Sequence, residues 1–296
     1  MMGAIVVAVG FAGSGCEDNG TAVTDETPAI PVGPGTVCPC DGDCSAVRTL
    51  NFAGYTWQVR QSSNPLQAGQ NCYSGGPEEV WVDAQGRLHL KTRKRNNIWV
   101  CPEIYCTGFF GYGTYVFYVS SRVDTLDRNV VLGLFTWDDA ALAAGSLSEI
   151  DVEITKWGNE FAHNLNYTVQ PGYGPDTENH RYEERMNTSF MTLAQDQSTH
   201  VIDWTADRIK FASYQGYGIS QDRVIATWQF DKTNPARRSD AETLTTPIVI
   251  PAPSATSGVH LNLWLKDVTS DGYGDPPASG EPVEVILDGF EFAPAT

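Results

Sequence analysis

The sequence reads Ser148-Glu149-Ile150-Asp151-Val152-Glu153-Ile154 at the point that decides its fold. Successive side chains of a β-strand point to opposite faces, so the three acids share one face and the branched apolar residues share the other. We therefore expect a strand whose apolar face packs into a core while Glu149, Asp151 and Glu153 point outward.

Three carboxylates in line on one face repel each other, and a strand gains no stability from that repulsion. The repulsion has a chemical use, because a carboxyl group crowded by anions keeps its proton to higher pH while its neighbour stays ionised. A proton donor beside a carboxylate is the pair that cleaves a glycosidic bond. A solvated polar face and a calcium site are the two alternative interpretations, since acidic clusters also have structural roles.

The rest of the chain is made of short apolar or alternating runs separated by Gly, Pro, Asn and Asp. No long segment has the 3.6-residue period of a helix. Many short strands with turn signals between them predict one all-β domain, a sandwich or a barrel. The strands that we expect span residues 87–92, 114–119, 130–137, 149–154, 161–169, 201–204, 208–214, 224–230, 260–265 and 283–292.

The 296 residues carry a formal net charge of -17. Such a protein repels phosphate backbones, so we expect no nucleic-acid partner, and strongly anionic polysaccharides are disfavoured. The sequence has no Gly-x-Ser-x-Gly elbow, phosphate-binding loop or His-Glu-x-x-His zinc motif. These absences disfavour serine hydrolase, nucleotidase and zinc protease chemistry.

Residues 1–16 are interpreted as an export signal, because an apolar run from Ala4 to Ala12 precedes small residues and Cys16. The segment resembles a bacterial lipoprotein signal, in which the cysteine is lipidated, although no Lys or Arg occurs before Arg48. Cleavage and free secretion is the alternative. We expect a secreted, periplasmic or cell-surface monomer whose only membrane contact is a lipid anchor at Cys16. Residues 17–46 are interpreted as a flexible tether with a cysteine cluster, and residues 47–296 as the folded domain.

An exported chain meets an oxidising environment, so we expect its cysteines to form disulfides. A zinc site is the alternative, but the close spacing of the first three does not match paired Cys-x-x-Cys ligands. The six cysteines after Cys16 are Cys38, Cys40, Cys44, Cys72, Cys101 and Cys106.

The acidic strand resembles the active-site strand of glycoside hydrolase family 16, which includes lichenases, laminarinases, agarases and carrageenases. The resemblance covers roughly residues 51–292 and implies a jelly-roll β-sandwich of two curved antiparallel sheets with a concave cleft. The other matching pieces follow in the family's order and are Phe110-Gly111-Tyr112-Gly113-Thr114-Tyr115, Leu134-Phe135-Thr136-Trp137, Asp203-Trp204-Thr205 with Arg208-Ile209-Lys210-Phe211, Leu261-Asn262-Leu263-Trp264 and Leu287-Asp288-Gly289-Phe290.

The resemblance implies a catalytic role for each acid. Glu149 would be the nucleophile, Glu153 the general acid/base, and Asp151 would tune the nucleophile. No cofactor is required for this chemistry. The family positions that line the cleft and bind sugar are matched by Trp137, Asn166, Asn262 and Trp264, and more loosely by Glu103.

Two further features are implied by the resemblance alone. A bridged pair in lichenase-like members predicts a disulfide between Cys72 and Cys101. A family ligand in the closing strand predicts a structural calcium ion at Asp288, with a turn aspartate as the alternative.

The resemblance implies an endo-acting, retaining glycoside hydrolase whose partner is a polysaccharide. The single residue between Asp151 and Glu153 is typical of lichenase-like members, and favours a β-glucan with β-1,3 or mixed β-1,3/1,4 linkages. Three departures concern the substrate: no Trp precedes Glu149, an Arg expected after Glu103 is missing near Tyr105, and residues 171–185 have no counterpart. A galactanase, a transglycosylase and a non-catalytic lectin-like protein on the same fold are the alternatives.

Overall fold

The computed structural model describes residues 40, 48–106, 108–144, 148–170, 186–231 and 250–295. One sheet, here sheet A, has eight strands in the order β1-β2-β7-β16-β9-β10-β11-β12. All of its pairs are antiparallel. The strands are β1 (Arg48–Phe52), β2 (Tyr55–Val59), β7 (Glu103–Cys106), β16 (Ser257–Leu265), β9 (Val130–Asp138), β10 (Ile150–Ile154), β11 (Leu165–Val169) and β12 (Met186–Ser189).

The second sheet, sheet B, has nine strands in the order β15-β14-β13-β8-β17-β5-β6-β3, with β4 also paired to β5. Its pairs are antiparallel except for β3 and β6. The strands are β15 (Val224–Asp231), β14 (Arg208–Gln215), β13 (Gln197–Trp204), β8 (Gly113–Ser120), β17 (Val283–Pro294), β5 (Leu88–Arg95), β6 (Ile98–Cys101), β3 (Cys72–Tyr73) and β4 (Val80–Val82).

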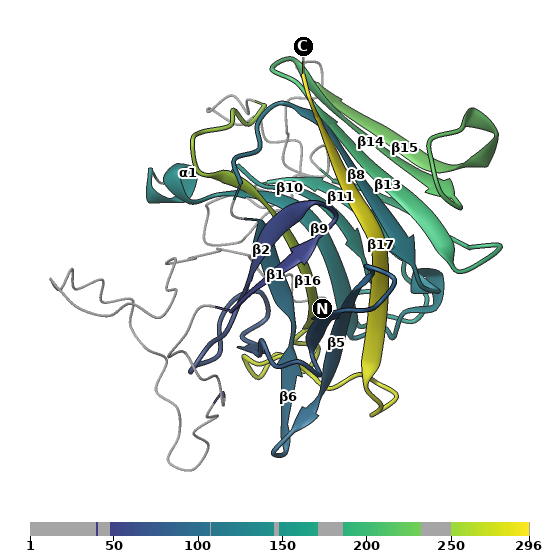
Figure 1. Cartoon of the computed structure of the whole chain (residues 1–296). Coiled ribbons are helices and arrows are strands. Elements are labelled where there is room, and N and C mark those ends of the chain that lie inside the picture. The colour runs from purple at the N-terminus through teal and green to yellow at the C-terminus, as the bar shows by residue number, and fades with distance from the viewer. Residues whose placement is uncertain are drawn as a thin grey trace, which may run out of the picture.

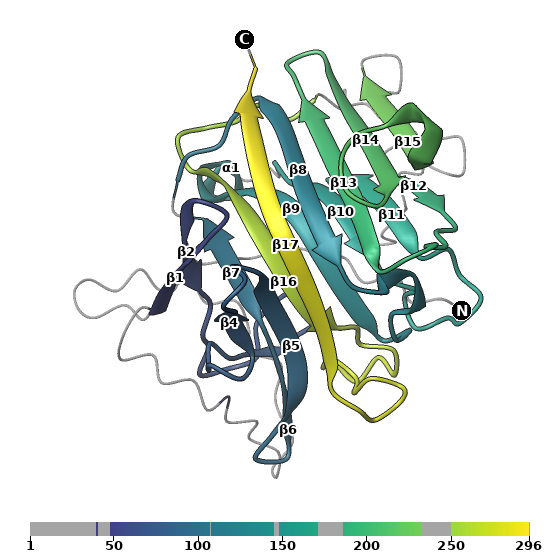
Figure 2. The same cartoon turned by 45° about the vertical axis from the view of Figure 1, so that its right-hand side comes forward.

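The two sheets pack face to face, as Figures 1 and 2 show from two directions. Both contribute alternate side chains to one core, with Leu134 and Val152 from sheet A and Phe117 and Ile202 from sheet B. Alternation of this kind is what a β-sandwich requires. The predicted all-β jelly-roll sandwich of two antiparallel sheets is confirmed.

Within the described residues, helical structure is confined to short pieces: α1 (Asp139–Ala143) and 3-10 turns at Val123–Thr125 and Gln221–Arg223. Asp138 caps α1, since its carboxylate accepts hydrogen bonds from the backbone N–H groups of Ala140 and Ala141. In the described part of the chain, no helix has the length and apolarity needed to cross a bilayer. The predicted export signal, most of the tether, and the loop at residues 171–185 lie outside the described residues.

The predicted disulfide between Cys72 and Cys101 is wrong. Cys72 is bonded to Cys40, and the buried Cys101 is a free thiol, as is Cys106. The parallel register of β3 and β6 pairs Cys72 with Val100 and Tyr73 with Cys101. Cys72 and Cys101 are thus offset by one residue and point to opposite faces of the sheet, which prevents a bond between them.

Candidate active site

The three acids lie on the face of sheet A that points away from the core. Ile150, Val152 and Ile154 are fully buried between the sheets, so the alternating acids take the other side, here called the acidic face. β10 is an inner strand between β9 and β11, and the backbone N–H of Gln170 extends this ladder to the carbonyl of Glu149. The structure therefore brings Glu149, Asp151 and Glu153 together, as the alternation predicts.

Glu149 and Asp151 are shielded from water although their face is outside the core, whereas Glu153 is partly exposed. Glu149 is 8% exposed and Asp151 2% exposed. Burial, followed by the charge of Glu153, raises the pKa of Glu149 to about 8. Burial and the charge of Glu149 raise the pKa of Asp151, and burial and the charge of Asp151 raise that of Glu153. The trio can therefore hold protons near neutral pH, which is what a general acid needs.

A polar row crosses the acidic face through Glu153. Strand register places Glu103, Asn262, Gly133, Glu153 and Asn166 side by side on β7, β16, β9, β10 and β11. Gly133 is required here, because a Cβ atom at this position would lie 2.4 Å from Asn262 Oδ1. With strands about 4.8 Å apart, Glu103 is roughly 14 Å from Glu153. Three of the predicted sugar-binding residues therefore share one row with the proposed acid/base.

The two predicted sugar-binding tryptophans lie on the same face at opposite ends of β9. Trp137 is on the Glu149 side, and its indole N–H donates to Asp139 over 2.8 Å. Trp264 is paired with Val131 on the Glu153 side. They are 3% and 4% exposed, so packing accounts for nearly all of their surface and little of either ring is free for a ligand.

Glu103 is fully buried and neutralised by two partners. Arg60 donates to it over 2.8 Å, and His260 Nδ1 lies 3.0 Å from its other oxygen. Burial alone would raise the pKa of Glu103, but the charge of Arg60 and the bond to His260 outweigh it and lower that pKa. Arg60 directly follows β2, which lies on the far side of β7 from β16, and it places a guanidinium near Tyr105, where the resemblance leads us to expect an arginine.

Unpaired polar atoms gather on the acidic face. Glu149 Oε2, Asp151 Oδ1 and Asn262 Oδ1 are buried and have no hydrogen-bond partner among the described residues. Buried polar atoms are rarely left unpaired in native proteins, and each one calls for an explanation. Each of the three is an oxygen that can accept a hydrogen bond, but each is closed off from solvent, so a ligand hydroxyl group would reach it only after neighbouring side chains move.

Sequence reasoning missed four residues of this face. Gln170 donates to Asp151 over 3.1 Å, and Trp157 donates to Asn166 over 3.2 Å. Phe135 and His260 form an aromatic contact with ring centroids 5.1 Å apart. Only Phe135 and His260 carried a signal, because the period of two in their strands places them beside Asp151; the other two depend on turns after β10 and β11.

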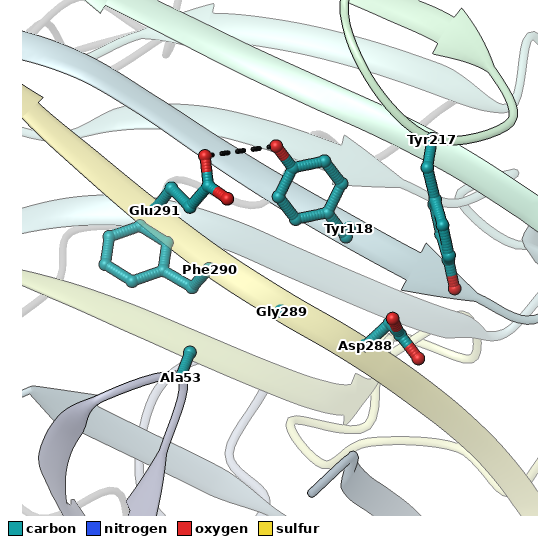
Figure 3. A pocket seen from close by; sticks show the side chains of 7 residues that line it. All are labelled: Ala53, Tyr118, Tyr217, Asp288, Gly289, Phe290 and Glu291. Carbon is teal, nitrogen blue, oxygen red and sulfur yellow. Dashed lines mark hydrogen bonds between the residues drawn. The ribbon is translucent and has the colours of Figure 1, made fainter. Parts of the chain in front are cut away.

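Asp288, the predicted calcium ligand, lies on the outer face of sheet B. It is the extra residue at a register shift between Leu287 and Gly289, and it lines a hollow of about 420 Å³. Figure 3 shows its carboxylate near Tyr217, and Glu291 of the same hollow accepts a hydrogen bond from Tyr118 over 3.2 Å. Nearby Arg87 is bound by Asp83 over 2.7 Å, and its pKa is raised first by that bond and to a smaller extent by the charge of Asp288. Among the described residues this set fits Ca²⁺ poorly, and calcium at Asp288 stays a prediction.

Comparison with models of known protein families found no match, and no curated protein sequence matched either. Solved structures do match. A β-glucanase of Bacillus licheniformis has a TM-score of 0.52 at 16% identity, covering 83% of this chain and 95% of its own. An immunostimulatory antigen and pseudo β-1,3-glucanase of Mycobacterium tuberculosis has a TM-score of 0.54 at 18% identity, covering 81% and 91%. A β-1,3-glucanase of Mycobacterium marinum has a TM-score of 0.51 at 15% identity, covering 80% and 90%. The chain therefore has the β-sandwich fold of the glycoside hydrolase family 16 β-glucanases.

Proposed function

We propose that this protein is an endo-acting, retaining glycoside hydrolase whose catalytic residues are Glu149, Asp151 and Glu153. One observation carries the proposal: three acids with raised pKa values, of which Glu149 and Asp151 are buried and Glu153 is partly exposed, lie on the outer face of a sandwich whose solved likenesses include β-glucanases. A structural strand would gain nothing from burying three carboxylates side by side. Acid/base chemistry on a glycosidic bond uses such a set.

Each acid has a separate role in the proposed reaction. In the reactive form Glu153 holds the proton and Glu149 is ionised, although burial raises the pKa of Glu149. Glu153 gives its proton to the leaving oxygen while the Glu149 carboxylate forms a bond to the anomeric carbon. Glu153 then takes a proton from water, which attacks that carbon and releases Glu149. Asp151, held by Gln170, lies between them and tunes Glu149.

Strand geometry supports retention of the anomeric configuration. Two Cα atoms four residues apart on a strand are about 13 Å apart. Two glutamate side chains that lean toward each other can bring their carboxyl groups to the roughly 5–5.5 Å of a retaining pair. The span between Glu149 and Glu153 is therefore compatible with a covalent intermediate, which the family resemblance implies, although an inverting pair with a wider gap would also fit this span.

The proposed substrate is a neutral β-glucan with β-1,3 or mixed β-1,3/1,4 linkages. The net charge of -17 and the acids on the binding face disfavour sulfated chains. The unpaired oxygens of Glu149, Asp151 and Asn262 suit the hydroxyl groups of a neutral sugar. A galactan is the alternative within the same fold.

A second candidate function is carbohydrate binding without catalysis. One structure with the same fold is described as a pseudo β-1,3-glucanase, so the fold alone does not guarantee turnover. Cleavage separates the two candidate functions: a binding protein would bind oligosaccharide without cleaving it, whereas a hydrolase would cleave it.

The test is to incubate the purified protein separately with lichenan, laminarin, agarose and carrageenan and to measure released reducing ends. We expect cleavage of at least one glucan, with the first-formed product in the β configuration by proton NMR. Cleavage of agarose or carrageenan alone would overturn the substrate, and an inverted first product would overturn the mechanism. Binding without any cleavage would favour the second candidate.

A further inference from the structure

Trp157 occupies a backbone conformation that tryptophan rarely adopts. It follows β10 in the turn Thr155-Lys156-Trp157-Gly158, where its φ is +52° and that of Gly158 is +82°. The turn is fixed by hydrogen bonds from the Trp157 N–H to Thr155 Oγ1 over 3.1 Å and from the Gly158 N–H to the Arg128 carbonyl over 2.7 Å. A bulky residue in the left-handed region is strained, and such residues gather at functional sites.

The indole of Trp157 reaches back onto the acidic face. Its N–H donates to Asn166 Oδ1 over 3.2 Å, and its ring lies 6.2 Å from that of Trp264, centroid to centroid. Asn166 is the register partner of Glu153, and Trp264 is on the same face two residues from Asn262. Trp157 borders the Glu153 end of the site, where it is partly buried and packs in part against the hydrophobic core.

The Asn166 amide is engaged on both sides. Its Nδ2 donates to the carbonyls of Glu153 and Thr155, each over 3.2 Å, and its Oδ1 accepts from Trp157. Both donor hydrogens are therefore used within the protein, and one acceptor position remains. Asn166 thus ties Trp157 to the backbone that carries Glu153, so it is a positioning residue more than a sugar donor.

We propose that Trp157 is the specificity-determining aromatic platform of the site, on which a pyranose ring stacks next to Glu153. The inference rests on the proposed function and adds a residue to it. A pyranose presents an apolar C–H face that an indole covers well, while the polar row of Glu153 and Asn262 meets its hydroxyl groups. A turn that needed only a left-handed residue would be served better by glycine or asparagine, and the tryptophan at this position is explained by what its ring does.

Substitutions at this position separate ligand binding from folding. Trp157→Ala and Trp157→Gly both remove the ring, but only glycine relieves the positive φ, so the glycine variant should melt at a higher temperature than the alanine variant. Both should weaken binding equally. Trp157→Phe keeps a ring, loses the bond to Asn166, and should fall between wild type and alanine.

The experiment measures affinity for β-glucan oligosaccharides by calorimetry in the non-cleaving Glu149→Gln background, and kcat and KM in the active protein. Trp157→Ala and Trp157→Gly should each raise Kd and KM about tenfold, the equivalent of about 1.4 kcal/mol, with a much smaller change in kcat. Ala53→Gly is the matched control, because Ala53 has a φ of +53° in the β1–β2 turn and should gain thermal stability with no change in Kd.

The experiment separates failure of the platform proposal from failure of the proposed function. Unchanged Kd and KM in Trp157→Ala, while wild type cleaves a glucan, would overturn the platform and leave the proposed function standing. A wild-type protein that neither binds nor cleaves any of the glucans would overturn the proposed function and the platform with it.

Discussion

Burying carboxyl groups on the acidic face lowers the free energy of unfolding. Glu149 and Asp151 are buried beside each other, and water is replaced only partly by hydrogen bonds such as that from Gln170. Ionising a buried, unpaired carboxyl group costs several kcal/mol unless its pKa rises. The raised pKa values of the trio are the sign of that cost, and they make a prediction about stability.

Glu149→Gln should stabilise the protein above neutral pH. The pKa of Glu149 is about 8 when folded, against an ordinary 4.5. Between these values the folded state binds more protons than the unfolded state, so the free energy of unfolding falls as pH rises through this window. Glutamine has no charge to bury, and the gain should be on the order of 1–3 kcal/mol at pH 8 and vanish near pH 4.

Urea unfolding at pH 4 and pH 8 measures this effect. Glu291→Gln is the control, because Glu291 is exposed on sheet B and should change the unfolding free energy little at either pH. A Glu149→Gln variant that is no more stable than wild type at pH 8 would contradict the raised pKa.

Much of the site at this scale could be predicted from the sequence. Alternation alone places the three acids on one face, and the resemblance adds Asn166, Asn262 and Trp264. Arg60 and Trp157 could not be found this way. Arg60 is 43 residues from Glu103 in sequence, and Trp157 depends on a left-handed turn that favours glycine and is not expected of tryptophan.

At the scale of elements, a buried histidine links the two sheets. His200 on β13 is fully buried, and its ring nitrogens lie 3.0 Å from Ser198 Oγ and 2.8 Å from Ser213 Oγ. Tyr167 on β11 of sheet A donates to the same Ser213 hydroxyl over 2.7 Å. Burial lowers the pKa of His200 to about 3, so it stays neutral in the folded protein.

His200→Gln should make the protein less sensitive to acid. Unfolded histidine takes up a proton near pH 6.5, whereas folded His200 does so only near pH 3, so the unfolded state binds more protons in this window. Stability therefore falls as pH drops from 6.5 to 3. Glutamine does not titrate and so removes this pH dependence, while the free energy of unfolding at pH 7 falls by about 1 kcal/mol because the hydrogen bonds are poorer. The midpoints of urea unfolding from pH 3 to 7 measure this pH dependence, with a His163→Gln variant at the partly exposed His163 as control. An unchanged pH dependence in His200→Gln would contradict the low pKa of His200.

The disulfide at the edge strand β3 makes a second prediction at this scale. Peptide mapping without reductant should recover Cys40 linked to Cys72, with Cys101 and Cys106 as free thiols. Cys72→Ser should lower the free energy of unfolding by about 2–4 kcal/mol, because the bond closes a loop with a sequence separation of 32. A mapped bond between Cys72 and Cys101 would contradict the offset register of β3 and β6.

The strands that were expected from sequence are those with a clear pattern. Residues 114–119, 130–137 and 208–214 correspond closely to β8, β9 and β14. The sequence did not predict the short strands β1, β2, β3, β4, β6, β7 and β12, because their place in a sheet depends on partners distant in sequence. The expected strand at 161–169 begins only at Leu165, and Phe161 is 88% exposed in the preceding turn.

The whole molecule is an acidic sandwich with two chemically different outer surfaces. The outer face of sheet A carries the buried acids and their polar row, while the outer face of sheet B carries the hollow around Asp288. The pattern of short strands separated by turn residues, together with the order of the motifs, was enough to predict this architecture. The predicted export signal, lipid anchor and monomeric state concern the intact protein in its cell and stay predictions.

The measurement that tests the central claim most directly is reducing-end release from lichenan and laminarin by wild type, Glu149→Gln, Glu153→Gln and the surface control Glu291→Gln. Removing the nucleophile or the acid/base should lower kcat by roughly a thousandfold or more, with melting curves that show an intact fold and oligosaccharide binding retained. Glu291→Gln should match wild type. A Glu149→Gln or Glu153→Gln variant with near-wild-type turnover would contradict the account.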